Sequence, residues 1–126
     1  MAAGSQSMKI LLVEDSQQIA ARLQELLEMD AGVRVVRIVA DQKSAIAAAR
    51  EFTYDAMILD LELASGSGFG VLEVLGDKQP PTIVMTNHAH PQYRRRALAL
   101  GACHFLDKAV EFEKVPELLA AMRAGG

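Results

Sequence analysis

Apolar residues recur along the chain in five short runs, at 9–15, 33–39, 57–60, 82–87 and 103–106. Polar or turn-forming residues bound each run, which is typical of β-strands. The second run is rich in β-branched residues but contains Arg34 and Arg37, so we expect it at one edge of a sheet. The fifth run is short enough to form the opposite edge.

Between these runs, apolar residues recur every three to four positions, which is the period of an amphipathic helix. The first two stripes follow Ser16 and Asp41, and both residue types cap helix amino termini. Pro91 suits the first turn of the fourth helix and Gly101 its end, whereas Pro116 is tolerated only in a first turn of the last. The apolar positions of the five predicted helices are Ile19, Leu23, Leu26 and Leu27; Ala45, Ile46, Ala49 and Phe52; Phe69, Val71 and Leu72; Tyr93, Ala97 and Leu100; and Val115, Leu118, Leu119 and Met122.

Strands that alternate with helices predict a doubly wound α/β domain, in which a five-stranded parallel sheet is covered on both faces. No internal repeat, low-complexity segment or linker divides the chain, so we expect one domain over residues 8–124. Residues 1–7 ("MAAGSQS") are small and polar and have no periodicity. They are expected to form a disordered leader or to be an expression remnant.

Composition excludes several classes of function. A formal net charge of −3, with acidic and basic residues spread along 126 residues, leaves no basic footprint for nucleic acid or for an anionic membrane. No apolar run approaches the roughly 18 residues of a membrane span, and the first residues lack a secretory signal pattern, so we expect a cytoplasmic protein. Cys103 is the only cysteine, and its apolar neighbours predict a thiol packed in the core.

Residues that can carry chemistry lie at the ends of the predicted strands. Glu14 and Asp15 end the first strand, Asp60 ends the third, Thr86 ends the fourth, and Lys108 follows the fifth. Because the carboxyl ends of parallel strands meet at one edge of a sheet, these side chains should converge. Close carboxylates repel by about 4 kcal/mol per pair at about 4 Å in an effective dielectric near 20, so the cluster predicts a bound cation. Oxygen-only ligands on a solvated rim favour Mg²⁺.

The same cluster predicts phosphoryl transfer. Lys108 supplies a positive charge and Thr86 a hydroxyl donor, and both suit the oxygens of a phosphoryl group. Asp60 is then free to act as the nucleophile. A carboxylate in that role forms an acyl phosphate.

From about residue 9 to residue 123, the chain resembles a response regulator receiver domain of two-component signalling. The resemblance depends on "ED" at 14–15, "LD" at 59–60, "MT" at 85–86 and "GACHFLDK" at 101–108, each at a predicted strand end. It implies a flavodoxin-like fold with strand order 2-1-3-4-5 and three α/β/α layers. Because the chain ends shortly after its last helix, we expect a stand-alone receiver whose output lies in another molecule.

The resemblance implies a role for each site residue. Asp60 would take the phosphoryl group from a histidine kinase, a phosphotransfer protein or a small phosphodonor, and Lys108 would stabilise its charge. Mg²⁺ would bind Asp15 directly and Glu14 mostly through water. Asp60 and the backbone carbonyl of Glu62 would complete the protein ligands.

The resemblance also implies a switch. Thr86 would move toward the phosphoryl oxygen and vacate space into which Phe105 turns. This movement would alter the surface formed by the fourth helix, the fifth strand and the fifth helix, where a downstream protein partner would contact Phe105 and the arginines of the fourth helix. Arg94, Arg95 and Arg96 begin the fourth helix and either form a solvated face or recognise an acidic partner. Three arginines alone do not make a nucleic-acid site.

The sequence departs from the family pattern in four places. Ala64 and Ala109 stand where prolines are usual, after the acceptor aspartate and after the lysine. A cis bond that does not precede proline costs roughly 2.5–4 kcal/mol, so we expect the Lys108–Ala109 bond, typically cis in the family, to be trans or strained. The stretch between the acceptor and the fourth strand end is a few residues short, and Glu14 replaces a frequent aspartate.

Glu62 and His88 lie two residues beyond Asp60 and Thr86, at positions that in the family flank the path of the hydrolytic water. If their side chains meet, a hydrogen bond between them could impede in-line attack and lengthen the phosphorylated lifetime. The small residues at 64–70 lack the lysine and spacing of a P-loop and predict flexibility near the acceptor.

We therefore expect a phosphoacceptor receiver that catalyses only its own phosphorylation and dephosphorylation and is not otherwise an enzyme. Target binding, a phosphorelay step and a phosphate sink all remain open. One alternative is a receiver-like interaction module that is never phosphorylated, against which the complete set of acids, hydroxyl and lysine argues. A remoter alternative is a small Mg²⁺-dependent phosphatase, since "DLE" at 60–62 is faintly similar to the D-x-D motif of haloacid-dehalogenase-like hydrolases.

Overall fold

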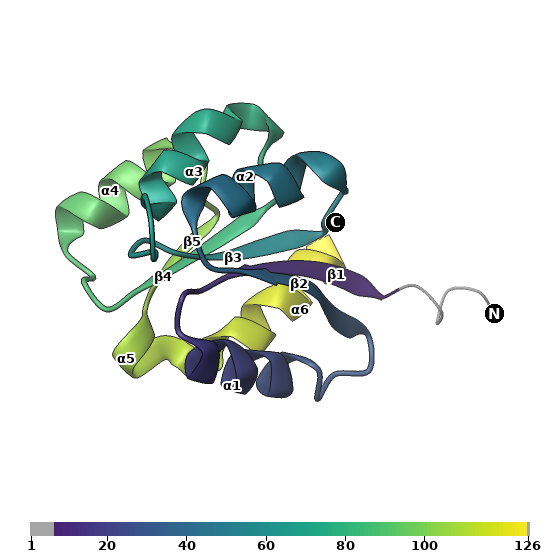
Figure 1. Cartoon of the computed structure of the whole chain (residues 1–126). Coiled ribbons are helices and arrows are strands. Elements are labelled where there is room, and N and C mark those ends of the chain that lie inside the picture. The colour runs from purple at the N-terminus through teal and green to yellow at the C-terminus, as the bar shows by residue number, and fades with distance from the viewer. Residues whose placement is uncertain (1–6, 126) are drawn as a thin grey trace.

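The computed structural model describes residues 7–125, so the predicted leader, except for Ser7, lies outside the described residues. The chain forms a sheet of five parallel strands. The sheet order is β2-β1-β3-β4-β5, which confirms the predicted order and both edge strands (Figure 1). The strands are β1 (Met8–Val13), β2 (Val33–Val39), β3 (Ala56–Asp60), β4 (Thr82–Thr86) and β5 (His104–Asp107).

Helices cover both faces of the sheet, and this confirms the doubly wound, three-layer architecture (Figure 1). One face carries α1 (Gln17–Leu27) and α6 (Val115–Gly125), and the other carries α2 (Gln42–Glu51), α3 (Gly68–Leu75) and α4 (Pro91–Ala99). Besides these five helices, residues 7–125 form three short helical segments: α5 (Lys108–Glu111), and the 3-10 turns η2 (Gly76–Lys78) and η3 (Phe112–Lys114). Within residues 7–125, no helix has the length and apolar character needed to cross a membrane.

The central strands β1 and β3 supply core side chains to both faces, because successive residues of a strand point to opposite sides. Leu11 and Leu59 pack with the side chains of α2, α3 and α4, whereas Leu12 and Ile58 pack with those of α1 and α6. All four side chains are buried. Continuous apolar runs therefore mark these two strands, and their carboxyl ends are held between two packed layers.

Local capping sets where the helices begin beside the carboxyl ends of the strands. Ser16 Oγ and Asp41 Oδ1 each accept a hydrogen bond from the backbone N–H three residues further on, at 3.2 and 2.8 Å, which confirms both predicted caps. Hydrogen bonds from Ser44 hold the pKa of Asp41 below its usual value. Pro91 begins α4, and Gly101, with a φ of 107°, follows the end of that helix.

The Lys108–Ala109 peptide bond agrees with the sequence-based expectation, and the position of Cys103 does not. No cis peptide bond occurs in the described part of the chain, so the Lys108–Ala109 bond is trans, as expected. The prediction for Cys103 is wrong, because its side chain is exposed. Cys103 precedes β5 at the edge of the sheet, where no further strand covers it, while its neighbours Ala102 and Phe105 take the buried positions.

Candidate functional site

The carboxyl ends of the strands bring three charged side chains into a buried cluster. Lys108 Nζ lies 2.8 Å from Glu14 Oε1 and 2.8 Å from Asp60 Oδ2. Glu14, Asp60 and Lys108 are only 4%, 5% and 7% exposed. Residues that are 94 and 48 positions apart in the sequence therefore form one ion-paired centre, as the parallel topology predicts.

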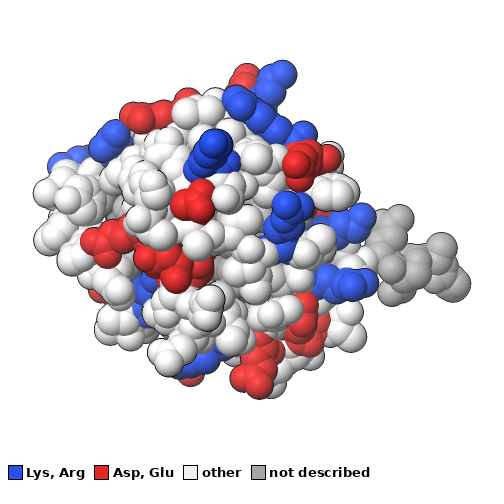
Figure 2. Space-filling view, in the orientation of Figure 1, with Lys and Arg blue, Asp and Glu red and all other residues white. Residues whose placement is uncertain are grey.

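A third carboxylate adjoins this centre at the surface. One oxygen each from Glu14, Asp15 and Asp60 lies within 4.8 Å of the other two, and Asp15 is exposed. Figure 2 shows a group of acidic side chains on the left of the visible face, the side on which β1 and β3 end in Figure 1. Lys108 compensates one of the three negative charges, which leaves two for a cation.

The donor set of this cluster fits Mg²⁺. At this separation each carboxylate pair repels by about 3–4 kcal/mol in an effective dielectric of about 20, so a divalent ion would relieve a large cost. Mg²⁺ prefers one or two carboxylates on a rim where it keeps several waters, and Asp15 at the surface meets that need.

Burial raises the pKa of the Glu14 carboxyl, because desolvation outweighs the hydrogen bonds that the carboxylate accepts from Lys108 and from the Ser16 N–H. Desolvation alone would lower the pKa of Lys108, but its hydrogen bonds to Asp60 and Glu14 favour the ammonium more, and the pKa is raised. Lys108 therefore stays charged at neutral pH and holds the two buried carboxylates together.

Thr86 and Phe105, the two residues of the expected switch, are both buried. Thr86 ends β4 with no exposed surface, and its Oγ1 accepts a hydrogen bond from the His88 N–H at 3.0 Å. Phe105 in β5 is 6% exposed and belongs to the core beneath α2, α3 and α4. The ring is thus already inside in this conformation. The expectation that Phe105 offers a contact to a partner is therefore wrong for this conformation.

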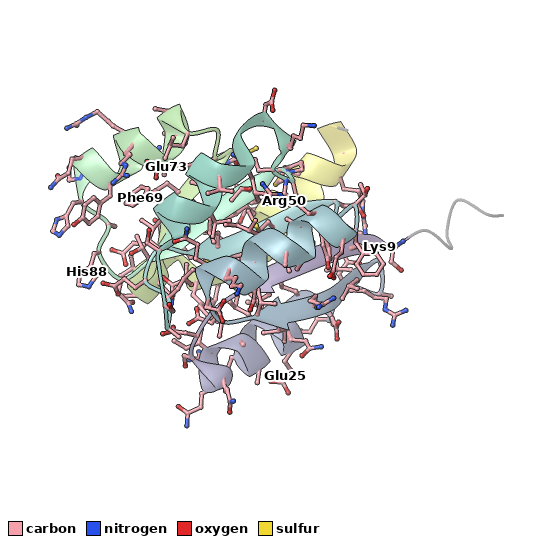
Figure 3. All side chains as sticks on the ribbon, turned by 45° about the horizontal axis from the view of Figure 1, so that its top comes forward. Lys9, Glu25, Arg50, Phe69, Glu73 and His88 are labelled. Carbon is pink, nitrogen blue, oxygen red and sulfur yellow. The ribbon has the colours of Figure 1, made fainter. Side chains whose placement is uncertain are left out.

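The loop after Asp60 closes one side of the cluster. The Glu62 N–H donates to Asp60 Oδ1 at 3.1 Å. The Glu62 carboxylate pairs with His88, with 2.7 Å between Oε2 and Nε2, so these two side chains meet as hypothesised. In Figure 3, His88 lies at the end of the molecule opposite Lys9, which is near the start of β1.

Two of the three arginines at the start of α4 have partners within the chain. Arg96 Nη2 lies 2.9 Å from Glu73 Oε2, and the Arg96 guanidinium carbon is 4.2 Å from the centroid of the Phe69 ring. Arg94 donates to a backbone carbonyl of β5 at 3.3 Å. Arg95 is exposed. An acidic partner would therefore have to compete with the contacts that Arg94 and Arg96 already make within the chain.

The sequence did not predict how the loop after Asp60 is held. Gln42, the first residue of α2, donates its N–H to the Ser65 carbonyl, and its side-chain oxygen accepts from the Ser67 N–H, each at 3.0 Å. Residues 64–70, expected to be flexible, are thus tied to a neighbouring helix. The one sequence signal was the small residues themselves, which leave room for a side chain from elsewhere.

Comparison with known proteins agrees with this geometry. The chain matches the family model of the response regulator receiver domain over residues 10–120. It is similar to protein-glutamate methylesterase/protein-glutamine glutaminase 1 of Myxococcus xanthus (strain DK1622), with 32% identity over 125 residues, 93% of this chain and 36% of that protein. It is also 28% identical over 109 residues to enzyme 2 of that name from Anaeromyxobacter dehalogenans (strain 2CP-C), covering 86% of this chain and 32% of that protein. The chain spans about a third of the length of these relatives.

Solved structures share the fold. The chemotaxis protein CheY4 of Vibrio cholerae aligns with a TM-score of 0.80 and 27% identity, covering 92% of this chain and 98% of that chain. A two-component response regulator of the LuxR family from Aurantimonas sp. SI85-9A1 aligns with a TM-score of 0.86 and 25% identity, covering 94% and 86%. The response regulator domain of Thermotoga maritima CheB, with a TM-score of 0.82, 24% identity and coverage of 94% and 96%, supports the fold alone.

Proposed function

Because the chain belongs to the family of response regulator receiver domains, we propose that it accepts a phosphoryl group on Asp60 in a two-component phosphorelay. The observation that carries the proposal is the Lys108 ammonium, which lies 2.8 Å from Asp60 Oδ2 in a buried centre beside the exposed carboxylate of Asp15. A histidine kinase, a phosphotransfer protein or a small phosphodonor would supply the group.

In the proposed step, a carboxylate oxygen of Asp60 attacks the phosphorus atom of the donor. A P–O bond forms while the bond from phosphorus to the leaving nitrogen or oxygen breaks, and the leaving group departs with that electron pair and takes a proton from solvent where it needs one. The Lys108 ammonium stabilises the charge that develops on the phosphoryl oxygens. The Thr86 hydroxyl, at the end of the adjacent strand, offers a second hydrogen-bond donor.

Asp15, Glu14 and Asp60, with the backbone carbonyl of Glu62, would hold Mg²⁺. When bound, the ion supplies positive charge to the phosphoryl oxygens. Asp15 would bind the ion directly and Glu14 mostly through water, as the family resemblance implies; both oxygens of Glu14 and both of Asp60 accept hydrogen bonds in this conformation.

We propose further that the chain transforms no substrate other than its phosphodonor. Methylesterase and glutaminase are the names of relatives about three times as long as this chain. Phosphorylation would instead change the surface of α4, β5 and α6, where Arg94, Arg95 and Arg96 are exposed, for a cytoplasmic protein partner rather than for nucleic acid or a membrane. A role as a phosphorelay step or as a phosphate sink would use the same phosphoryl transfer to Asp60.

Intact-mass measurement after incubation with Mg²⁺ and phosphoramidate or acetyl phosphate tests the proposal. The wild type should gain the mass of one phosphoryl group, and Asp60→Asn should gain none. Asp77→Asn, at an exposed aspartate of η2, is the matched control and should react as the wild type does. A wild type that gains no mass would instead be an interaction module, and repeated turnover of the donor without a stable adduct would indicate a phosphatase.

The Glu62–His88 pair should lengthen the life of the phosphorylated state. The pair is 2.7 Å apart and about half exposed, so its contribution is at most about 1 kcal/mol, which corresponds to a factor of about five in rate. We expect spontaneous dephosphorylation to be about two- to fivefold faster in Glu62→Ala and in His88→Ala. Loss of the phosphoryl mass with time, after the donor is removed, measures the rate.

Two controls separate the pair from its surroundings. Gln92→Ala, on the exposed surface of α4, should decay at the wild-type rate. The double variant should decay no faster than either single variant, because each substitution already removes the same contact. Decay at the wild-type rate in both single variants, or additive effects in the double variant, would rule out the hydrogen bond as the cause.

A further inference from the structure

Three hydrogen bonds tie the loop between β3 and α3 to the amino-terminal end of α2. The Gln42 N–H donates to the Ser65 carbonyl at 3.0 Å, and Gln42 Oε1 accepts from the Ser67 N–H at 3.0 Å. A third bond runs from the Ala64 N–H to the Ala40 carbonyl at 3.1 Å. The Gln42 side chain thus links the first turn of α2 to the loop between β3 and α3.

Two glycines leave the space that the Gln42 side chain fills. A Cβ at Gly70 would collide with the amide end of Gln42, and a Cβ at Gly66 would collide with its Oε1 and lie 2.5 Å from its Cβ. Gly66 also has a φ of 79°, a left-handed conformation that glycine adopts readily. The Gln42 side chain therefore occupies a fitted position between the loop and α3.

A series of contacts connects Gln42 to the phosphoacceptor Asp60. Ser67, whose N–H binds Gln42, forms an antiparallel β-bridge with Glu62. The Glu62 N–H in turn donates to Asp60 Oδ1 at 3.1 Å. Displacement of Ser67 would therefore move the backbone of Glu62 relative to Asp60.

Alanine at position 64 makes one of these bonds possible. A proline there, as the family resemblance leads one to expect, has no N–H and could not donate to the Ala40 carbonyl. Proline would restrict the loop by fixing its own φ, whereas this chain restrains the loop through hydrogen bonds to the residues around Gln42.

We propose that Gln42 is a positioning residue of the phosphoacceptor site, which holds Ser67 and, through the β-bridge, the Glu62 carbonyl in place for Mg²⁺. The inference rests on the proposed function, because the Glu62 carbonyl is an Mg²⁺ ligand only in that proposal. Residues that orient metal ligands typically change metal affinity by about 10- to 100-fold when they are mutated. Gln42 acts through two intervening residues, so an effect near the lower end, about tenfold, is expected.

Calorimetric titration with Mg²⁺ alone tests this inference without any phosphorylation. Gln42→Met keeps the length of the side chain but loses the acceptor oxygen, and should bind Mg²⁺ about tenfold more weakly. Gln42→Glu keeps the acceptor and should bind as the wild type does at high ionic strength, where its added charge is screened. Lys43→Met, at the exposed neighbouring position of α2, is the matched control and should also bind normally.

Urea unfolding of the same variants distinguishes positioning from general support of the fold. A lower unfolding midpoint in Gln42→Met with unchanged Mg²⁺ affinity would overturn the inference, as would equal weakening in Gln42→Glu or Lys43→Met. Weaker Mg²⁺ binding in Gln42→Met alone would support it. A wild type that binds Mg²⁺ but takes no phosphoryl group would refute the proposed function, while the titration would still decide the role of Gln42.

Discussion

Replacing Lys108 with methionine is expected to lower the free energy of unfolding by about 3–5 kcal/mol at neutral pH in the absence of Mg²⁺. Methionine keeps much of the side-chain volume but removes the ammonium that lies 2.8 Å from Glu14 Oε1 and from Asp60 Oδ2. Two buried carboxylates would then face each other without a cation, and the loss of one partner leaves a buried charge uncompensated. Urea unfolding followed by circular dichroism measures the change.

Two further variants test the cause of this loss. Lys43→Met is the matched control, because Lys43 is exposed and its replacement should change stability by less than about 0.5 kcal/mol. Adding Glu14→Gln to Lys108→Met should recover part of the loss, since one of the two carboxylates is then neutral. An equal loss in Lys43→Met, or no loss in Lys108→Met, would contradict a buried ion-paired centre.

Lowering the pH should narrow the difference in the free energy of unfolding between Lys108→Met and the wild type. Burial raises the pKa of Glu14 even beside the ammonium, and removal of the ammonium should raise this pKa further. Between the unfolded pKa of about 4.3 and the raised folded value, the folded state binds more protons than the unfolded state. The stability of the variant therefore rises as the pH falls through that window. A deficit that stays constant as the pH falls from about 7 to the unfolded pKa of Glu14 would mean that the carboxylates do not carry the cost.

The convergence of the site could be predicted because it depends on topology rather than on side-chain detail. β1 and β3 are apolar on both faces, so their ends are visible in the sequence where Glu14 and Asp60 begin a polar stretch. Parallel strands then bring both carboxylates to one edge, together with Lys108 after β5. What remained open was the contact of the Lys108 ammonium with Glu14 as well as with Asp60.

The failed and missing predictions concern the directions of single side chains. Cys103 has apolar neighbours, but hydrophobicity does not say on which side of an edge strand a residue lies, and this thiol faces outward. Phe105 is already buried in this conformation, whereas the resemblance implied a ring that turns inward as Thr86 moves. Gln42 and Ser67 are 25 residues apart, and their bond depends on the conformations of two loops that no periodic pattern describes.

Gly68→Ala should destabilise the fold by about 1–3 kcal/mol and slow the phosphorylation of Asp60. Gly68 begins α3 and is buried against the segment that carries the acceptor. A Cβ there would collide with the carbonyl oxygen of Asp60, and would lie 2.9 Å from Leu61 Cα and 3.1 Å from the Asp60 carbonyl carbon. All three are backbone atoms, so no change of rotamer relieves the contact and the backbone at Asp60 must shift.

Such a shift moves the Asp60 carboxylate relative to Lys108 and to the donor. A misplacement of about 1 Å can cost about 100-fold in rate, so we expect phosphorylation by phosphoramidate at saturating Mg²⁺ to slow by at least about tenfold. Gly32→Ala is the matched control, because its Cβ would meet the guanidinium end of Arg123, which can swing away. A wild-type rate in Gly68→Ala, or equal slowing in Gly32→Ala, would contradict the prediction. Because Gly68 carries no charge, a loss of rate there would mean that close packing of α3 beneath the acceptor loop, and not charge alone, sets the position of Asp60.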